Sequence, residues 1–367
     1  MPQEPVRPKL ADIAAIAGVS VATVSRVLDD HPAITPPTKA RVMAAVVELG
    51  YPLRSAQPKR TRPARIRRHR RQHGICVVMP AALPPGSQLA NPFELSLLGG
   101  IGAAMRDRGL DFALSAQAPY DNQSLLAFAA GHAYDGMIFL GQSQYHDGLN
   151  ALAEAGQALV VWGIEAPGQR YCSIGGDNFA GARDAVAHLA RLGRRRIAVI
   201  GPSAPITTAQ TGNSQLAERV AGCKAGLAAA GLADDLCIVR RFGPGQQIGT
   251  EAVEDLLRRK VAFDAILAFS DPIAAGAIDA LLRHRVRVPE DVAVIGYDDS
   301  DIARFVRPQL TSVRQDPVLA GELMVAKLLR LMDGMAVRSE RLPTSLAIRA
   351  SCGGTPGSAA PCRDEGE

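Results

Sequence analysis

The chain has 367 residues, too many for one ordinary hydrophobic core and enough for two or three domains. Apolar residues make up 47% and charged residues 21% at a net charge of +5, which excludes a wholly disordered chain. No apolar run is long enough to cross a bilayer, and the N-terminus MPQEPVRPKLAD has no secretory leader. We therefore expect a cytoplasmic protein with no membrane partner and with reduced cysteines.

The charge is distributed unevenly along the chain. Residues 1–72 hold 14 basic and 5 acidic side chains, whereas the remaining residues hold 27 basic and 31 acidic ones. A basic head therefore precedes a mildly acidic body. This asymmetry predicts a module that binds a polyanion, joined to domains with another role.

Three short helices are expected in the basic head, between residues 10 and 50. Gly18 supplies the positive φ that a tight turn after the first helix needs. Ser20 is placed to cap the second helix by accepting a backbone N–H bond. Ala14 and Val24 lie at the spacing that lets two helices approach and share a core. The pattern predicts a helix-turn-helix unit with a third helix behind it.

Two stretches of the head, ADIAAIAGVSVATVSRVLDD and TKARVMAAVVELGY, resemble the head-piece of the LacI/GalR family of transcriptional regulators. In this geometry the second helix enters the major groove of double-stranded DNA. The alternative is a three-helix bundle with no role in DNA binding. The coincidence of the motif with the basic charge favours the DNA-binding interpretation.

The resemblance assigns candidate DNA contacts to the second helix. The family's specificity positions fall on Val21, Ala22 and Arg26, of which Arg26 can donate two hydrogen bonds to a guanine. Val21 and Ala22 can only contact or exclude a thymine methyl group. The hydroxyl side chains around them set the register on phosphates without reading sequence, and these are Ser20, Thr23 and Ser25.

A basic linker is expected at residues 54–73. Eight of the thirteen residues from Lys59 to Arg71 are basic and none is acidic. The family resemblance implies a hinge helix with a leucine in the minor groove, but no residue here matches that leucine. Two interpretations remain: a disordered tether that contributes counterion release, or arginines inserted into a narrow A·T-rich minor groove. The candidate contacts are Arg60, Arg62 and Arg65.

From residue 74 onward, short apolar strands such as GICVVM, RIAVIG and DVAVIGY alternate with helices. This alternation predicts parallel sheets that are covered by helices on both faces. Two such series, each of about 110 residues, predict two doubly wound lobes. A ligand would bind between the lobes at the carboxyl ends of the strands.

The body also resembles the effector-binding core of the same family, which is similar to type I periplasmic sugar-binding proteins. Matching stretches include NPFELSLLGGI, AERVAGCKAGL and VPEDVAVIGYDDSDIARFVRPQLTSVRQD. The resemblance implies a small carbohydrate-like effector and a homodimer. Asp271 is expected to be either a helix N-cap or a ligand, and Asp299 to bind backbone or solvent. The effector residues that the resemblance implies are Phe93, Asp177, Arg219, Ser270 and Asp298.

The expected fold class is a small all-α helix-turn-helix domain joined to two α/β lobes. The first lobe is expected at about 74–190 plus 316–344, and the second at about 191–315 plus 345–352. The whole chain then divides into a DNA-binding domain at 8–53, a linker at 54–73, a bilobed effector and dimerisation domain at 74–352, and a disordered tail at 353–367.

These features predict a sequence-specific transcriptional regulator, expected to act as a repressor. It would bind pseudo-palindromic operators as a dimer under allosteric control by the effector. Two alternatives are an α/β enzyme with a DNA-binding head and a nucleoid-type DNA binder without an effector. The sequence has no paired nucleophile and base, no metal-ligand spacing and no phosphate-binding loop. No enzyme activity, metal or cofactor is therefore expected.

Overall fold

The structure, a computed structural model, describes only part of the chain. The chain forms two compact units, Met1–His69 and Arg70–Glu367. The linker at 54–73 and the tail beyond residue 355 lie outside the described residues. Within the described ranges, no helix is both long enough and apolar enough to span a membrane. These ranges are 10–28, 35–49, 74–79, 91–115, 119, 121–132, 134–141, 146–203, 214–233, 237–241 and 243–355.

The first unit contains the expected helix-turn-helix. Gly18 has a φ of +62°, and the Ser20 hydroxyl accepts a hydrogen bond from the Thr23 N–H at 3.1 Å. Ala14 and Val24 are both buried, in a small core that the third helix completes. The turn and the N-cap expected from the sequence are thus confirmed. The helices are α1 (Leu10–Ala17), α2 (Val21–Leu28) and α3 (Pro36–Glu48).

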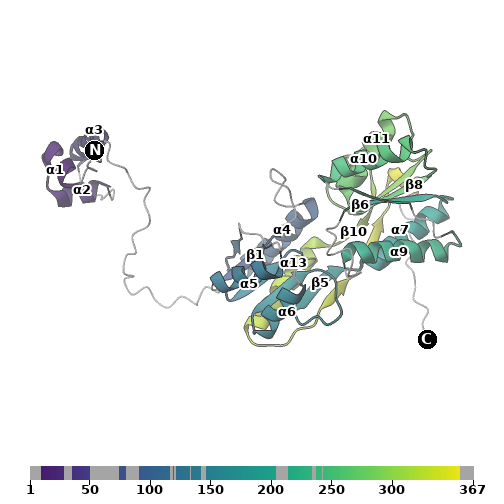
Figure 1. Ribbon diagram of the computed structural model, residues 1–367, viewed down its shortest axis with the longest axis horizontal. Coiled ribbons are helices and arrows are strands. Elements are labelled where there is room, and N and C mark those ends of the chain that lie inside the picture. Colours follow the sequence, from purple (N-terminus) through teal and green to yellow (C-terminus); the bar gives the residue numbers. More distant parts are fainter. Residues whose placement is uncertain are drawn as a thin grey trace, which may run out of the picture. The chain divides into compact units, whose positions relative to one another are not determined.

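The first lobe of the second unit is a parallel sheet with helices on both faces (Figure 1). Its strand order is β11-β5-β4-β3-β1-β2, and α4 and α13 cover one face while α5 and α6 cover the other. The central strands are buried on both faces, which explains their continuous apolar sequences. The elements are β1 (Ile75–Val78), α4 (Pro92–Asp107), β2 (Ala113–Leu114), α5 (Asn122–Gly131), β3 (Gly136–Phe139), α6 (His146–Glu154), β4 (Ala158–Trp162), β5 (Cys172–Gly176), α13 (Pro317–Met332) and β11 (Glu340–Leu342).

The second lobe repeats this architecture, with strand order β12-β10-β9-β8-β6-β7. Helices α10 and α11 cover one face and α7 and α9 the other (Figure 1). Only β12 runs antiparallel to its neighbour β10 among the described strands. The elements are α7 (Asn178–Arg191), β6 (Ile197–Pro202), α9 (Gln215–Ala229), β7 (Cys237–Arg241), α10 (Gly245–Arg258), β8 (Ala265–Ala268), α11 (Asp271–Arg283), β9 (Ala293–Asp298), α12 (Ile302–Phe305), β10 (Thr311–Arg314), β12 (Ser345–Ala347) and the 3₁₀ helix η1 (Ala350–Cys352).

The chain passes between the lobes three times, between β5 and α7, between β10 and α13, and between β11 and β12. Helix α7 belongs to the second lobe, because its buried residues Val186 and Leu189 share a core with Leu227 of α9. The first crossing therefore precedes α7, whereas the expected lobe boundary at residue 190 follows it. The apolar stripe of a helix predicts that it packs on a sheet, but not on which of two similar sheets.

Candidate functional site

One candidate site is the surface of α2 in the helix-turn-helix. Val21 is 46% exposed, and Ala22 and Arg26 are exposed on the same helix. Val24 and Val27 point the other way, into the core of the unit. The three side chains expected to meet base edges are thus available to a ligand. Ser20 is exposed and Thr23 and Ser25 are half-buried, while Arg60, Arg62 and Arg65 lie outside the described residues.

The second candidate site lies at the junction of the lobes, around Arg219 of α9. Arg219 is only 6% exposed. Its Nε donates to Asn178 Oδ1 at 2.8 Å, and its Nη1 donates to the Phe269 carbonyl at 2.5 Å. The guanidinium also lies over the Tyr297 ring, 3.6 Å from its centroid. Its remaining nitrogen, Nη2, is 3.7 Å from Asp298 Oδ1, so the two residues form a buried ion pair.

Asp298 ends β9, where its φ of +99° turns the chain sharply. Its Oδ1 accepts a hydrogen bond at 2.8 Å from Nε2 of Gln315, which lies in the second crossing between the lobes. Burial raises the pKa of Asp298, and the nearby Arg219 and the Gln315 hydrogen bond act in the opposite direction. Gln315 packs so closely on Gly176 that a Cβ there would lie 2.1 Å from its Oε1. The carboxylate is thus held where two crossings meet.

Asp177 lies on the first crossing and caps α7 by accepting from the Ala180 N–H at 3.0 Å. Arg341 of β11 is 3.8 Å from Asp177 and donates to Glu218 Oε1 at 3.0 Å. Since Glu218 belongs to the second lobe and Arg341 to the first, this ion pair joins the lobes. Burial raises the pKa of Glu218 in spite of Arg341. A hollow of about 10 Å³, room for one water molecule, lies beside the pair.

Two of the predicted effector residues, Phe93 and Ser270, make contacts within their own lobes. Phe93 packs on Trp162 in the core of the first lobe, with ring centroids 5.2 Å apart. Ser270 caps α11, because its hydroxyl accepts from the Ile273 N–H at 3.5 Å. Asp271 is therefore not the N-cap. It is fully buried and accepts hydrogen bonds from the backbone N–H and hydroxyl of Ser300 and from the hydroxyl of Ser312, in its own lobe.

Glu94, next to Phe93, was not among the predicted site residues. It closes a capping box at the start of α4, where its carboxylate accepts from the Asn91 N–H at 2.9 Å. Burial raises the pKa of Glu94 to about 7, and the negative charge of Asp298 adds to the effect. Glu94 and Asp298 come from different lobes, yet their carboxylates lie within electrostatic reach of each other. The junction therefore carries an excess of acidic groups.

Sequence reasoning also missed Asn178, Tyr297 and Gln315. Asn178 and Tyr297 are the direct neighbours of the predicted residues Asp177 and Asp298. Gln315 lies at the second crossing, one residue after β10. A search for polar or aromatic residues next to each predicted strand end or crossing would have included all of them.

The junction brings together the guanidinium of Arg219, the side-chain amides of Asn178 and Gln315, and several carboxylates. Such a set can both donate to and accept from hydroxyl groups, as a polyhydroxylated molecule requires. Among the described residues, no group of three or more His, Cys, Asp or Glu side chains could hold a metal ion.

Comparison with known proteins identifies the family. Residues 9–52 match the bacterial regulatory proteins of the lacI family, and residues 186–352 match a periplasmic binding protein-like domain. The HTH-type transcriptional regulator CelR of Thermobifida fusca is 33% identical, over 94% of this chain and 98% of CelR. The chain belongs to the LacI family. It is accordingly a DNA-binding transcriptional regulator, and its relatives are named as regulators and not as enzymes.

Other LacI-family proteins extend the comparison. The regulator MalR of Streptomyces coelicolor is 31% identical, over 95% of this chain and 98% of MalR. A solved CelR–cellobiose complex is 32% identical with a TM-score of 0.66, over 94% of this chain and all of that one. The lac repressor dimer bound to operator and the anti-inducer ONPF, 24% identical with a TM-score of 0.64 over 95% and 99% of the two chains, has the same fold.

Proposed function

We propose that this LacI-family regulator binds a pseudo-palindromic operator as a homodimer and acts as a repressor in the cytoplasm. A small neutral carbohydrate, bound between the lobes, would set its affinity for the operator. The observation that carries the effector proposal is the buried Arg219–Asp298 pair at the junction of the lobes. The cellobiose bound by the related CelR supports the same ligand class.

The charge of the junction favours an uncharged ligand. Burial is the main cause of the raised pKa of both Glu94 and Asp298, so their negative charges are already poorly solvated at the junction. A sugar acid or a sugar phosphate would bring further negative charge to carboxylates that burial already destabilises. A neutral sugar can instead donate its hydroxyl protons to Asp298 and accept hydrogen bonds from Arg219 and Asn178. The structure therefore supports a neutral sugar over an anionic one.

The effector proposal is tested by isothermal titration of the full chain with cellobiose, maltose and ribose, and with gluconate as the anionic comparison. We expect one or more neutral sugars to bind and gluconate not to bind. In Arg219→Lys the positive charge beside Asp298 remains but the fork of donors is lost, so sugar binding should weaken. The matched control is Arg241→Lys, a paired arginine on β7, which should bind as the native chain does. Equal sugar affinity in both variants would refute the assignment of the site.

On the DNA side, we propose that Arg26 reads a guanine and that Val21 and Ala22 contact neighbouring base pairs. Arg26→Ala should cost about 1–3 kcal/mol of binding to the cognate operator and relax the preference at one base pair. The control is Arg41→Ala, which removes an exposed arginine from α3 of the same unit. Binding is measured on a series of single-base operator variants. If Arg26→Ala keeps the native base preference at every position, the assignment of Arg26 is wrong.

We further propose that Arg60, Arg62 and Arg65 add phosphate or minor-groove contacts. Their support is the basic composition of residues 59–71 directly after the DNA-binding unit. A chain that lacks residues 59–71 should then show a shallower dependence of operator affinity on salt, because fewer counterions are released. An unchanged salt dependence would instead mean that this segment is only a solvated run of charge.

A further inference from the structure

The backbone at the end of β9 is unusual. Two consecutive residues with side chains, Asp298 and Asp299, have positive φ angles, +99° and +51°. Such conformations are unfavourable for residues other than glycine and persist only where the surrounding structure holds them. The first of the two is the carboxylate of the candidate effector site. The contacts that hold this turn therefore determine where that carboxylate points.

Asp299 supplies the strongest of these contacts. Its side chain is only 2% exposed, and the carboxylate bridges two arginines. Arg314 Nε donates to Oδ2 at 2.7 Å, and Arg349 Nη2 donates to Oδ1 at 2.5 Å. The Asp299 N–H donates to Ser312 Oγ at 3.0 Å, which fixes the backbone as well. The expectation that the Asp299 side chain binds backbone or solvent was therefore wrong, because its partners are two arginine side chains.

The hydrogen bonds extend from Asp299 to its neighbours. Ser312 Oγ in turn donates to the buried Asp271 at 2.6 Å. Both the N–H and the hydroxyl of Ser300 donate to the other oxygen of Asp271, at 2.6 and 2.9 Å. The N–H groups of Asp299 and Ser300 are thus bonded to side chains on β10 and α11, respectively. The turn is thus held by Ser312 on β10 and by Asp271 on α11.

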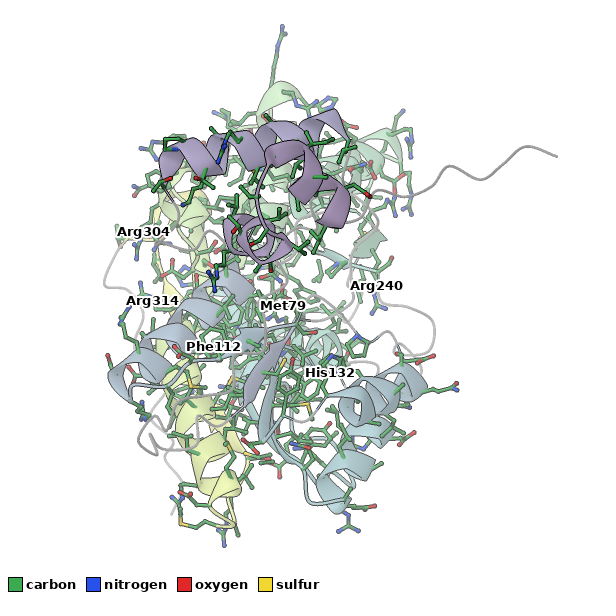
Figure 2. The ribbon with its side chains drawn as sticks, turned by 90° about the vertical axis from the view of Figure 1, so that its left-hand side faces the viewer. Met79, Phe112, His132, Arg240, Arg304 and Arg314 are labelled. Atoms are coloured by element: carbon green, nitrogen blue, oxygen red, sulfur yellow. The ribbon has the colours of Figure 1, made fainter. Side chains whose placement is uncertain are left out.

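The two arginine partners lie where the chain passes between the lobes. Arg314 is the last residue of β10, directly before the second crossing, and it lies opposite Asp298 in the sheet register. Figure 2 shows Arg314 on the left and Arg240 of β7 on the right, and the two strands that carry them lie toward opposite edges of the sheet. Arg349 follows β12, just after the third crossing, and its Nη1 donates to the Leu310 carbonyl at 2.6 Å. Asp299 thus connects the turn to both crossings.

We propose that Asp299 is a positioning residue. Its carboxylate, held between Arg314 and Arg349, keeps the left-handed turn in the conformation that presents Asp298 to the effector, and couples that turn to the two crossings. The positioning of Asp298 is a property of the free chain. Its consequence for affinity rests on the proposed function, in which Asp298 binds the effector.

The test compares Asp299→Asn with a matched control in the full chain. Asparagine tolerates the left-handed conformation, so the substitution removes the charge and preserves the backbone preference. The control, Asp255→Asn, removes another buried carboxylate of the same lobe, one that is paired with Arg241, Arg258 and Arg259 away from the junction. Because both variants lose arginine pairs, a general loss of stability lowers the Tm of each.

Two measurements separate positioning from stability. Hydrogen exchange of the free chain should become about tenfold faster or more at the amides of residues 299 and 300 in Asp299→Asn only. Titration with cellobiose should show about tenfold or more weaker binding in Asp299→Asn and native affinity in Asp255→Asn. Arg314→Gln, which removes the half-exposed partner and keeps Arg349, should change both quantities in the same direction by less. This milder variant remains informative if Asp299→Asn fails to fold.

Each outcome has a definite meaning. Unchanged exchange at residues 299 and 300 in both Asp299→Asn and Arg314→Gln overturns the proposal, as does an equal loss in Asp255→Asn. Faster local exchange with native cellobiose affinity also overturns it, because Asp298 would then be positioned by other groups. Faster local exchange in a chain whose native form binds no sugar supports the positioning role and refutes the effector proposal alone.

Discussion

Replacing Arg219 by methionine tests how the junction of the lobes is held together. Methionine keeps much of the volume of the arginine stem but removes its charge and its donors. The substitution removes the hydrogen bonds that Arg219 donates to Asn178 and to the Phe269 carbonyl, and it leaves Asp298 without its buried cation. Asp298 keeps the hydrogen bond from Gln315, but burial continues to disfavour its charged form. The free energy of unfolding should therefore fall.

The distance gives the size of the effect. Two unit charges 3.7 Å apart attract each other by about 4.5 kcal/mol at an effective dielectric constant of about 20. Part of the lost attraction is offset, because the variant no longer has to bury a charged guanidinium. We therefore expect the free energy of unfolding to fall by about 3 kcal/mol, the lower end for a broken buried pair. At about 2–4 °C per kcal/mol for a domain of this size, the Tm should fall by about 6–12 °C.

The assay is thermal unfolding of the full chain, measured by calorimetry. The double variant Arg219→Met/Asp298→Asn is measured beside the single variant. Removing the orphaned carboxylate should recover a substantial part of the lost stability. Arg241→Met is the control, because its partner Asp255 keeps two other arginines. The reasoning is refuted if Arg219→Met melts at or above the native Tm, or if the double variant is no more stable than the single one.

Three further predictions concern stability. The free energy of unfolding should fall as the pH rises from 4 to 7, because the pKa of Asp271 is raised to about 7, mainly by burial and also by the charge of Asp298. In Asp271→Asn, chemical denaturation should show that the free energy of unfolding depends less steeply on pH. Gly249→Ala should lower the Tm by several degrees, since its Cβ would lie 2.0 Å from a carbonyl oxygen of α11. In contrast, a Cβ at Gly99 would meet no other part of the described structure within 4 Å, so Gly99→Ala should be neutral or stabilising by about 0.5–1 kcal/mol. Glu218→Gln should cost less than about 1 kcal/mol by the same melting assay, because its partner Arg341 is 48% exposed, and a loss of several kcal/mol would contradict this.

Much of the fold could be predicted because it is encoded locally. The turn at Gly18 and the cap at Ser20 follow from residues a few positions apart. The strands of both lobes are short buried runs between helices, and nearly all of them pair in parallel as expected. The lobe to which α7 belongs could not be predicted, because its apolar stripe would fit either sheet.

The candidate effector site was predicted only in part. Arg219 and Asp298 come from distant parts of the chain and meet in a buried ion pair, which supports their selection from family motifs. Phe93, chosen in the same way, lies in the core of the first lobe instead. Asn178 and Gln315 escaped notice because neither amide stands out in the sequence, and only the crossings between the lobes bring them to Arg219 and Asp298.

The sequence by itself determined the helix-turn-helix, the alternating strands and helices, and the family, because these depend on local spacing and on motifs. The tertiary structure decided which charges meet: that Arg341 joins Glu218 across the lobes, and that Asp299 lies between Arg314 and Arg349. The physical reason is that such pairs depend on strand register and on the path of three crossings. A shift of one residue in either would point these side chains elsewhere.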